Sequence, residues 1–174
     1  SEAGQIGDSG SALSVVNIAG DSESTVTVDG SIYAYDVNVG AGTLELYGDF
    51  YDPNSADELK TLTFTDDGIV SLGNGYTIEH NITTTNDGEG TIIFQGQGEV
   101  TGQIGEAEKY LKAIHVTNNG SSVNLGTDED FALPSYVNRL SFVNGDPEGE
   151  VDSPTVDFYG DAYIGQDSAS AAIT

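Results

Sequence analysis

The chain of 174 residues contains no cysteine, no methionine and no tryptophan, and only four lysine and arginine residues. Without cysteine it can form neither disulfides nor thiolate metal sites, which excludes the small secreted domains that disulfides hold together. Four basic residues cannot build a phosphate-binding face, so we expect no nucleic acid partner and no attraction to anionic membranes. The apolar runs are too short to cross a bilayer, so we expect no membrane insertion.

Acidic residues dominate the charge, because 29 aspartates and glutamates give a net charge of −25. They are scattered, and the compact state must offset their repulsion through salt, bound cations or a shape that spreads the charge. Ca²⁺ takes six to eight oxygen ligands, so the acidic turns are candidate calcium loops, with solvated turns as the alternative. The candidate ligands are Asp66, Asp67, Asp128, Glu129, Asp130, Asp146 and Glu148.

Short segments in which apolar and polar residues alternate recur along the whole chain, and this period of two is typical of β-strands. The expected strands lie at 25–28, 32–39, 43–46, 61–64, 91–94, 137–143 and 155–158. Turns rich in glycine, asparagine and aspartate separate them, as at 66–68, 87–88 and 118–120. Only the segments 57–62 and 106–114 have a spacing that suits a helical turn or two, so we expect under about 10% helix against an ordinary ~30–35%.

Two sequence repeats indicate a repetitive body. The segment 43–51 matches 155–163, and Gly-Gln-Ile-Gly at 4–7 recurs at 102–105, with a looser copy at 163–166. We therefore expect one all-β body over residues 1–174, with degenerate repeats that start near residues 4, 102 and 160. A β-solenoid of the parallel β-helix kind explains the recurrence best, and a β-sandwich is the alternative fold.

The segment 91–105, Thr-Ile-Ile-Phe-Gln-Gly-Gln-Gly-Glu-Val-Thr-Gly-Gln-Ile-Gly, resembles repeat units of bacterial autotransporter-type surface antigens. In that family the unit is followed by a Leu-x-x-Ile-x-Val strand, here Leu111–Val116, and then by a Gly/Asn turn and another strand, here 118–125. The resemblance covers 91–125 well and the segments 1–20 and 150–174 partly. It implies an extracellular, repetitive β structure that serves as a surface layer or adhesin.

No motif for catalysis accompanies this pattern. His80 and His115 lie in alternating apolar segments, which favours strand positions that face solvent or hold a hydrogen bond over a catalytic base. The sequence has neither a phosphate-binding loop nor a nucleophile elbow. With this many carboxylates a pair of the glycosidase kind would arise by chance, so we expect no enzyme.

These observations predict a secreted or cell-surface structural protein, which self-assembles into a filament, a sheath or an S-layer-like array. An adhesin passenger or a carbohydrate-binding module, with glycans as partners, is the alternative, and a carbohydrate-active enzyme is a third class. Both termini lie within repeat-like segments, so terminal strands would pair between copies and form a homopolymer. The competing interpretation is an excerpt of a longer repeat protein with covalent neighbours, which the lack of methionine even at position 1 also suits.

Overall fold

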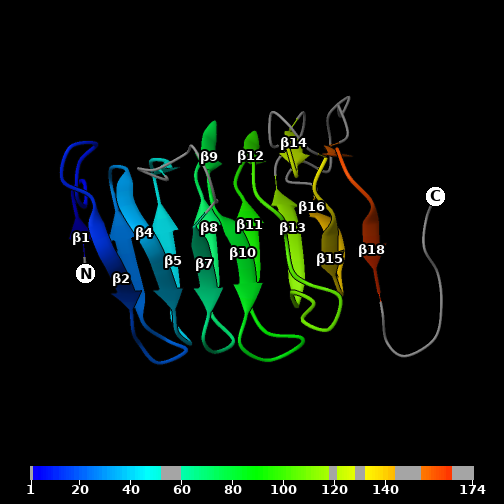
Figure 1. Cartoon of the computed structure of the whole chain (residues 1–174), viewed down its shortest axis with the longest axis horizontal. Coiled ribbons are helices and arrows are strands. Elements are labelled where there is room, and N and C mark those ends of the chain that lie inside the picture. The colour runs from blue at the N-terminus through cyan, green and yellow to red at the C-terminus, as the bar shows by residue number, and fades with distance from the viewer. Residues whose placement is uncertain (1, 52–59, 118–120, 128–131, 144–153, 166–174) are drawn as a thin grey trace.

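A computed structural model describes residues 2–51, 60–117, 121–127, 132–143 and 154–165. Its strands stand side by side across the long axis, from β1 at one end to β18 at the other (Figure 1). Every strand pairs in parallel with its neighbours, and each pairing joins one coil of the chain to the next, as with Thr27 to Glu45. The fold is a β-solenoid, which confirms the favoured prediction and removes the sandwich alternative.

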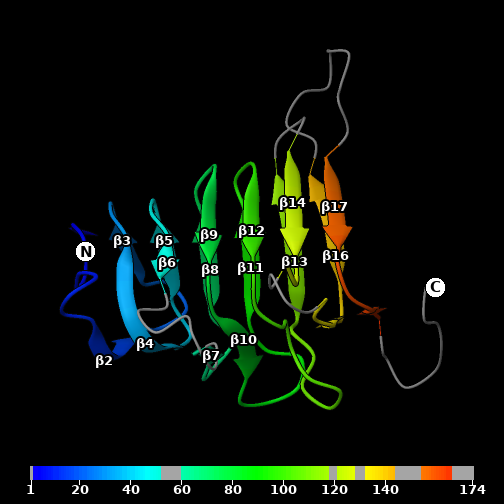
Figure 2. The same ribbon diagram turned by 45° about the horizontal axis from the view of Figure 1, so that its top comes forward.

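The coil has three faces, and the first of them is a sheet of seven strands, which gives seven layers. Figure 2 shows the strands of successive layers side by side. The first face consists of β1 (Glu2–Ala3), β3 (Thr25–Val28), β5 (Thr43–Leu46), β8 (Ile69–Leu72), β11 (Thr91–Phe94), β13 (Ala113–Thr117) and β16 (Leu140–Val143). The second consists of the start of β4 (Ile32–Val39), β6 (Phe50–Tyr51), β9 (Tyr76–Ile78), β12 (Gly98–Val100), β14 (Ser122–Leu125) and β17 (Thr155–Phe158). The third consists of β2 (Leu13–Ile18), the rest of β4, β7 (Thr61–Phe64), β10 (Asn81–Thr84), β15 (Ser135–Val137) and β18 (Ala162–Ile164).

Apolar residues form columns that run through the layers inside the coil. One column of the first face contains Val28, Leu46, Leu72, Phe94, Val116 and Phe142. One column of the second face contains Ile6, Ile32, Phe50, Ile78, Val100, Leu125 and Phe158. In layers two to six every member of both columns is fully buried. Each such side chain contributes about 1.5–3 kcal/mol of hydrophobic stabilisation, so these columns hold the layers together.

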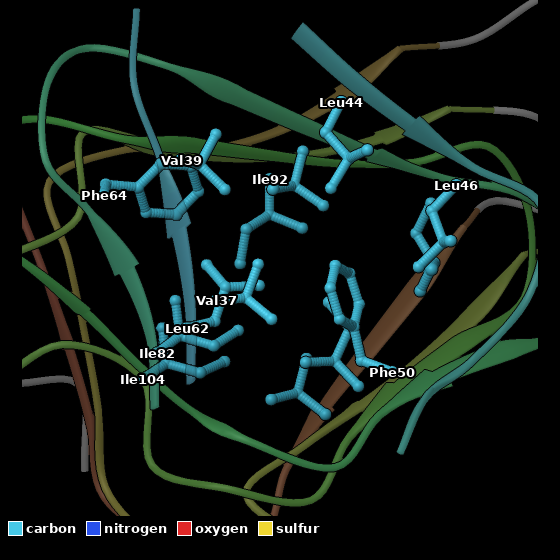
Figure 3. Packing of buried hydrophobic residues seen from close by; sticks show 14 of the residues in the cluster. Val37, Val39, Leu44, Leu46, Phe50, Leu62, Phe64, Ile82, Ile92 and Ile104 are labelled. Carbon is cyan, nitrogen blue, oxygen red and sulfur yellow. The ribbon is translucent and has the colours of Figure 1, made fainter. Parts of the chain in front are cut away.

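The strands turn inward-facing residues towards a common interior because their alternation has a period of two. Figure 3 shows Leu44 and Leu46 of β5, Phe50 of β6 and Leu62 of β7 approaching one another from the three sides. At several corners between faces a glycine lies directly on the peptide of the preceding layer, and the closest is Gly68, where a Cβ would lie 1.9 Å from the Gly40 oxygen. A Cβ at Gly48 would lie 2.3 Å from the Gly30 carbonyl carbon, and a Cβ at Gly160 would lie 2.3 Å from the Leu133 oxygen. A Cβ at Gly102 would likewise lie 2.3 Å from the His80 oxygen.

The helical turns that the spacing suggested are wrong where the structure can test them. Segment 106–110 is a loop and Ala113–Thr117 is strand β13, while Thr61–Phe64 is strand β7 and residues 57–59 lie outside the described part. The expected strand 137–143 divides at a corner into β15 and β16. The described residues include no helix, and so none long and apolar enough to cross a membrane.

Candidate functional site

The two Gly-Gln-Ile-Gly motifs fold into the same local structure. The side-chain amide of Gln5 donates a hydrogen bond to the Gly7 oxygen at 2.9 Å, and that of Gln103 donates to the Gly105 oxygen at 2.8 Å. Gly7 and Gly105 have positive φ angles of 72° and 66°. That conformation and the carbonyl of the next layer, 2.6 and 2.5 Å from where a Cβ would lie, both require glycine.

After each motif the chain leaves the coil for six residues, 7–12 in one copy and 105–110 in the other, which we call the excursions. In the first excursion the backbones of Asp8 and Ser11 exchange two hydrogen bonds, and in the second those of Glu106 and Lys109 do the same. The chain then returns to the coil at a leucine. As a result Ile6 and Leu13 pair with Ile32 and Ala34, only two residues apart, and Ile104 and Leu111 pair with Ser135 and Val137.

Each excursion lies over a tyrosine of the next layer, and that tyrosine stacks on another in the layer after. The Tyr33 and Tyr51 rings are 4.8 Å apart between centroids at an interplanar angle of 19°. Those of Tyr136 and Tyr163 are 4.7 Å apart at 4°. We call the group of Ile6, Tyr33 and Tyr51 the first tyrosine unit, and that of Ile104, Tyr136 and Tyr163 the second.

In each unit the tyrosine of the later layer, Tyr51 or Tyr163, which we call the outer tyrosine, ends a Tyr-Gly-Asp-x-Tyr segment. The aspartate of that segment, Asp49 or Asp161, lies two residues before it. The hydrogen bond from the Tyr51 hydroxyl to Asp49, together with the charge of that carboxylate, raises the pKa of Tyr51. The charge of Asp161 raises the pKa of Tyr163, and partial burial and a hydrogen bond to the same carboxylate add to the effect. Asp49 also accepts a hydrogen bond from the Thr77 backbone at 2.7 Å, which fixes its position.

The two tyrosine units occupy different faces of the coil. Ile6 belongs to the column of the second face, whereas Ile104 pairs with Ile82 of the third. The other repeat has moved in the same direction, because Thr43 lies on the first face and Thr155 on the second. Each repeat therefore returns one face further around the coil, which is why its copies are not a whole number of coils apart.

Of the candidate calcium ligands, the structure describes Asp66 and Asp67 alone. The Asp66 carboxylate accepts a hydrogen bond from the Asp67 backbone at 2.8 Å, and Asp67 forms an ion pair with Lys112. In the described part of the chain no three acidic or histidine side chains gather as metal ligands. Asp128, Glu129, Asp130, Asp146 and Glu148 lie outside the described residues, so calcium binding at those loops stays a prediction.

The two histidines have different surroundings. His80 is fully buried at the corner between β9 and β10, where its Nε2–H donates to the Ala34 oxygen at 3.0 Å and its ring meets Phe50 edge to face. His115 is partly buried in β13, with Nδ1 in contact with the Ser141 hydroxyl. Burial, followed by the charge of Arg139, lowers the pKa of His115. The strand pattern allowed a position that faces solvent or one that holds a hydrogen bond. His80 occupies the second kind, since it holds a hydrogen bond inside the core.

A polar groove of about 440 Å³ lies on the outer side of the third face, beside the second excursion. Its polar lining side chains are Thr61, Asn81, Thr83, Gln103 and Glu106. The Thr83 hydroxyl donates to Glu106 at 2.9 Å, and the Asn81 side chain accepts from the Gln103 backbone at 2.8 Å. Hydroxyl and amide groups around a single carboxylate suit a neutral, hydroxyl-rich ligand better than a charged one.

The tyrosine pairs were missed at the level of sequence, although the signal was present. Both Tyr-Gly-Asp-x-Tyr segments are visible as a repeat, but their partners Tyr33 and Tyr136 come from other layers and lie in unlike segments, Ser-Ile-Tyr-Ala at 31–34 and Pro-Ser-Tyr-Val at 134–137. Comparisons of the chain with protein-family models, with curated proteins and with solved structures returned no match.

Proposed function

We propose that the chain is a non-enzymatic structural protein of the cell surface or the extracellular space, which assembles end to end into a filament, sheath or array. The observation that carries this proposal is the state of the columns at the two ends of the coil. Phe142, in the last described layer of the first face, has 49% of its surface exposed, whereas its column neighbour Val116 is fully buried. Phe158 and Ile6 at the two ends of the second-face column are only partly buried.

A second copy placed head to tail would continue the column of the second face in register. Its Ile6 would follow Phe158, just as Ile32 follows Ile6 within one copy, and its β1 would pair with β16. Parallel pairing between the last strands of one copy and the first strands of the next would satisfy the backbone groups at both edges. Such a contact is heterologous, and it produces an open polymer when the rotation between copies does not close a ring.

The net charge of −25 opposes this contact, because copies of one sign of charge repel each other. Assembly should therefore depend on screening. The Debye length falls from about 10 Å at 0.1 M salt to about 3 Å at 1 M, so we expect polymers at high salt and smaller species at low salt. Calcium at millimolar concentration would have the same effect if the acidic loops bind it.

Electron microscopy and sedimentation of the purified chain at both salt concentrations test the proposal. Phe142→Asp places a charge at the contact and should abolish polymers at 1 M salt while leaving the circular dichroism of the strands unchanged. Tyr47→Asp is the matched control, because Tyr47 is 39% exposed at a corner of the third layer, away from both ends. Polymers of normal length from Phe142→Asp, or an exclusively monomeric wild-type chain at 1 M salt, would contradict the proposal.

The groove on the third face favours a second candidate function, the binding of glycans by an adhesin or a carbohydrate-binding module. Its neutral hydroxyl and amide groups can exchange hydrogen bonds with sugar hydroxyls. A glycan array probed with the wild-type chain and with Asn81→Leu tests it, and binding that the substitution leaves unchanged would place the ligand elsewhere. A reducing-end assay on polysaccharides separates binding from hydrolysis, for which we expect no activity.

A further inference from the structure

The stacked tyrosine pairs bring two phenol rings of neighbouring layers into contact at the outer surface. All four rings are partly exposed, and their centroid separations of 4.8 and 4.7 Å match the spacing of neighbouring strands. In a near-parallel stack the ring carbons next to one hydroxyl lie over the corresponding region of the other ring. This is the arrangement from which two phenoxyl radicals can join through those carbons with little movement.

Each pair also has a proton acceptor in place. The Asp49 carboxylate raises the pKa of the Tyr51 hydroxyl through a hydrogen bond and its charge, and the Asp161 carboxylate raises the pKa of Tyr163 through its charge, so a carboxylate lies beside each of these phenols. A phenol that loses one electron becomes a strong acid, so it gives up its proton at once when a carboxylate already holds the hydrogen bond. Removal of the electron is then easier, because the product is a neutral radical and not a radical cation.

We infer that the two tyrosine pairs, Tyr33 with Tyr51 and Tyr136 with Tyr163, are sites of oxidative crosslinking to dityrosine by a haem peroxidase that uses hydrogen peroxide. Each phenol loses one electron and its hydroxyl proton, and the two radicals form a carbon–carbon bond between positions next to the hydroxyls. The hydrogen on each bonded carbon then moves to the phenol oxygen and restores both rings. One hydrogen peroxide accepts two electrons and two protons, and two water molecules leave.

The geometry distinguishes these pairs from the other tyrosines. Tyr47 and Tyr159 are more exposed, at 39% and 56%, yet neither stacks on another tyrosine in the described part of the chain. The ring centroids of Tyr110 and Tyr136 are 5.4 Å apart, but the angle between the ring planes is 85°, so the two rings meet edge to face. Oxidation of dilute protein should therefore yield bonds within one chain at the two stacked pairs, each of which would tie one layer of the coil to the next.

The experiment is treatment of the full chain with horseradish peroxidase and a limiting amount of hydrogen peroxide, at low salt and low protein concentration. We expect blue dityrosine fluorescence, loss of two hydrogens per bond in the intact mass, and no covalent dimer. Trypsin cuts after Lys109, Lys112 and Arg139, so it places Tyr110, Tyr136 and Tyr163 on separate peptides and identifies the partners directly. An acid-specific protease separates Tyr33 from Tyr51 at Asp36 and Glu45.

Matched variants determine which tyrosines react. Tyr51→Phe and Tyr163→Phe keep the stacked rings and should each remove one bond, whereas Tyr47→Phe should remove none. Asp49→Asn should slow the first bond by about tenfold or more while leaving the second unchanged, as expected for loss of a positioned base. Bonds mainly at Tyr47 or Tyr159, mainly between chains, or in equal yield from the chain unfolded in urea would each overturn the inference.

Discussion

The two tyrosine units are one design in two settings. In the first unit Phe50 lies beside the outer tyrosine and is fully buried, with Ile78 as its next column neighbour. In the second unit the same position of the repeat is Ala162, which is partly exposed in the last described layer. The excursions share only their first glycine, and the largest difference between them is that Ala12 in the first corresponds to Tyr110 in the second.

This comparison separates the features that both tyrosine units share from those that depend on where a unit lies in the coil. The glutamine hydrogen bond, the positive-φ glycine, the excursion and the tyrosine stack occur in both copies, so they belong to the unit. The buried phenylalanine occurs in the copy that has described layers on both sides, so it belongs to the interior of the coil. Tyr110, which is 8% exposed and meets Tyr136 edge to face, adds a third ring where the coil has fewer layers beyond it.

The largest difference in unfolding free energy should come from substitutions at Phe50 and Ala162, which occupy the same position of the repeat in the two units. Phe50→Ala removes a fully buried ring and should cost about 3–5 kcal/mol of unfolding free energy. Ala162→Phe adds a ring at a partly exposed position and should change the unfolding free energy by less than about 1 kcal/mol. Urea unfolding followed by circular dichroism measures both, and equal effects would mean that the two settings do not differ.

The corner glycines should give the next largest effect. At Gly48 and Gly160 a Cβ would lie 2.3 Å from backbone atoms of the preceding layer. Gly48→Ala should cost about 1–3 kcal/mol because layers on both sides resist movement, and Gly160→Ala should cost less. Gly4→Ala is the control, since nothing lies within 4 Å of its Cβ position. A cost at Gly160 above that at Gly48 would contradict the idea that the last described layer can move.

Exchange of the excursion residues should have a smaller effect. Tyr110→Leu keeps an apolar side chain but loses the edge-to-face contact with Tyr136, which should cost about 0.5–1.5 kcal/mol. Ala12→Tyr supplies the missing ring to the first unit and should stabilise it by at most about 1 kcal/mol. Thermal unfolding of the two variants and of the double variant measures how much stability the aromatic ring contributes in each excursion. A destabilising Ala12→Tyr would show that the first excursion has no room for the ring.

The smallest effect should be a response to pH confined to the layer of the second unit. The folded state lowers the pKa of His115 below its ordinary value near 6.5, so the unfolded chain binds this proton more tightly. The contribution of His115 to the unfolding free energy is therefore fully present above pH 6.5, and it is lost as the pH falls below that value. Hydrogen exchange at pH 7 and 5.5 should show faster opening of β13 but not of β5, and His115→Asn should remove the difference.

The sequence predicted the fold class and most strands because inward and outward residues alternate regardless of which face they occupy. It failed at 106–114, where Ala107, Tyr110, Leu111 and Ile114 have helical spacing for unrelated reasons. Tyr110 is buried outside the coil's core against Tyr136, whereas Leu111 and Ile114 point into the core from two different faces. Periodicity cannot separate these causes, because the corner between the faces leaves no distinct signal.

The candidate site was predictable only in part, for a related reason. Gly-Gln-Ile-Gly and Tyr-Gly-Asp-x-Tyr are local, so both were visible as repeats. Tyr33 and Tyr136 join them only through pairing between layers, and the number of residues per coil varies. Glu2 pairs with Thr27 and Thr27 with Glu45, so successive coils differ in length by several residues. Without a constant period, the sequence cannot show which residues meet one coil later.

The shift of each repeat by one face has a consequence for what the molecule presents to its surroundings. On a coil with three faces, one face corresponds to about a third of a full rotation around the axis. The two excursions therefore project from the coil in different directions and do not form a single row. A duplication that adds a fraction of a coil is harmless to such a core and redirects whatever it carries. The two copies thus present their outer loops on different sides of the coil while the interior columns continue unchanged.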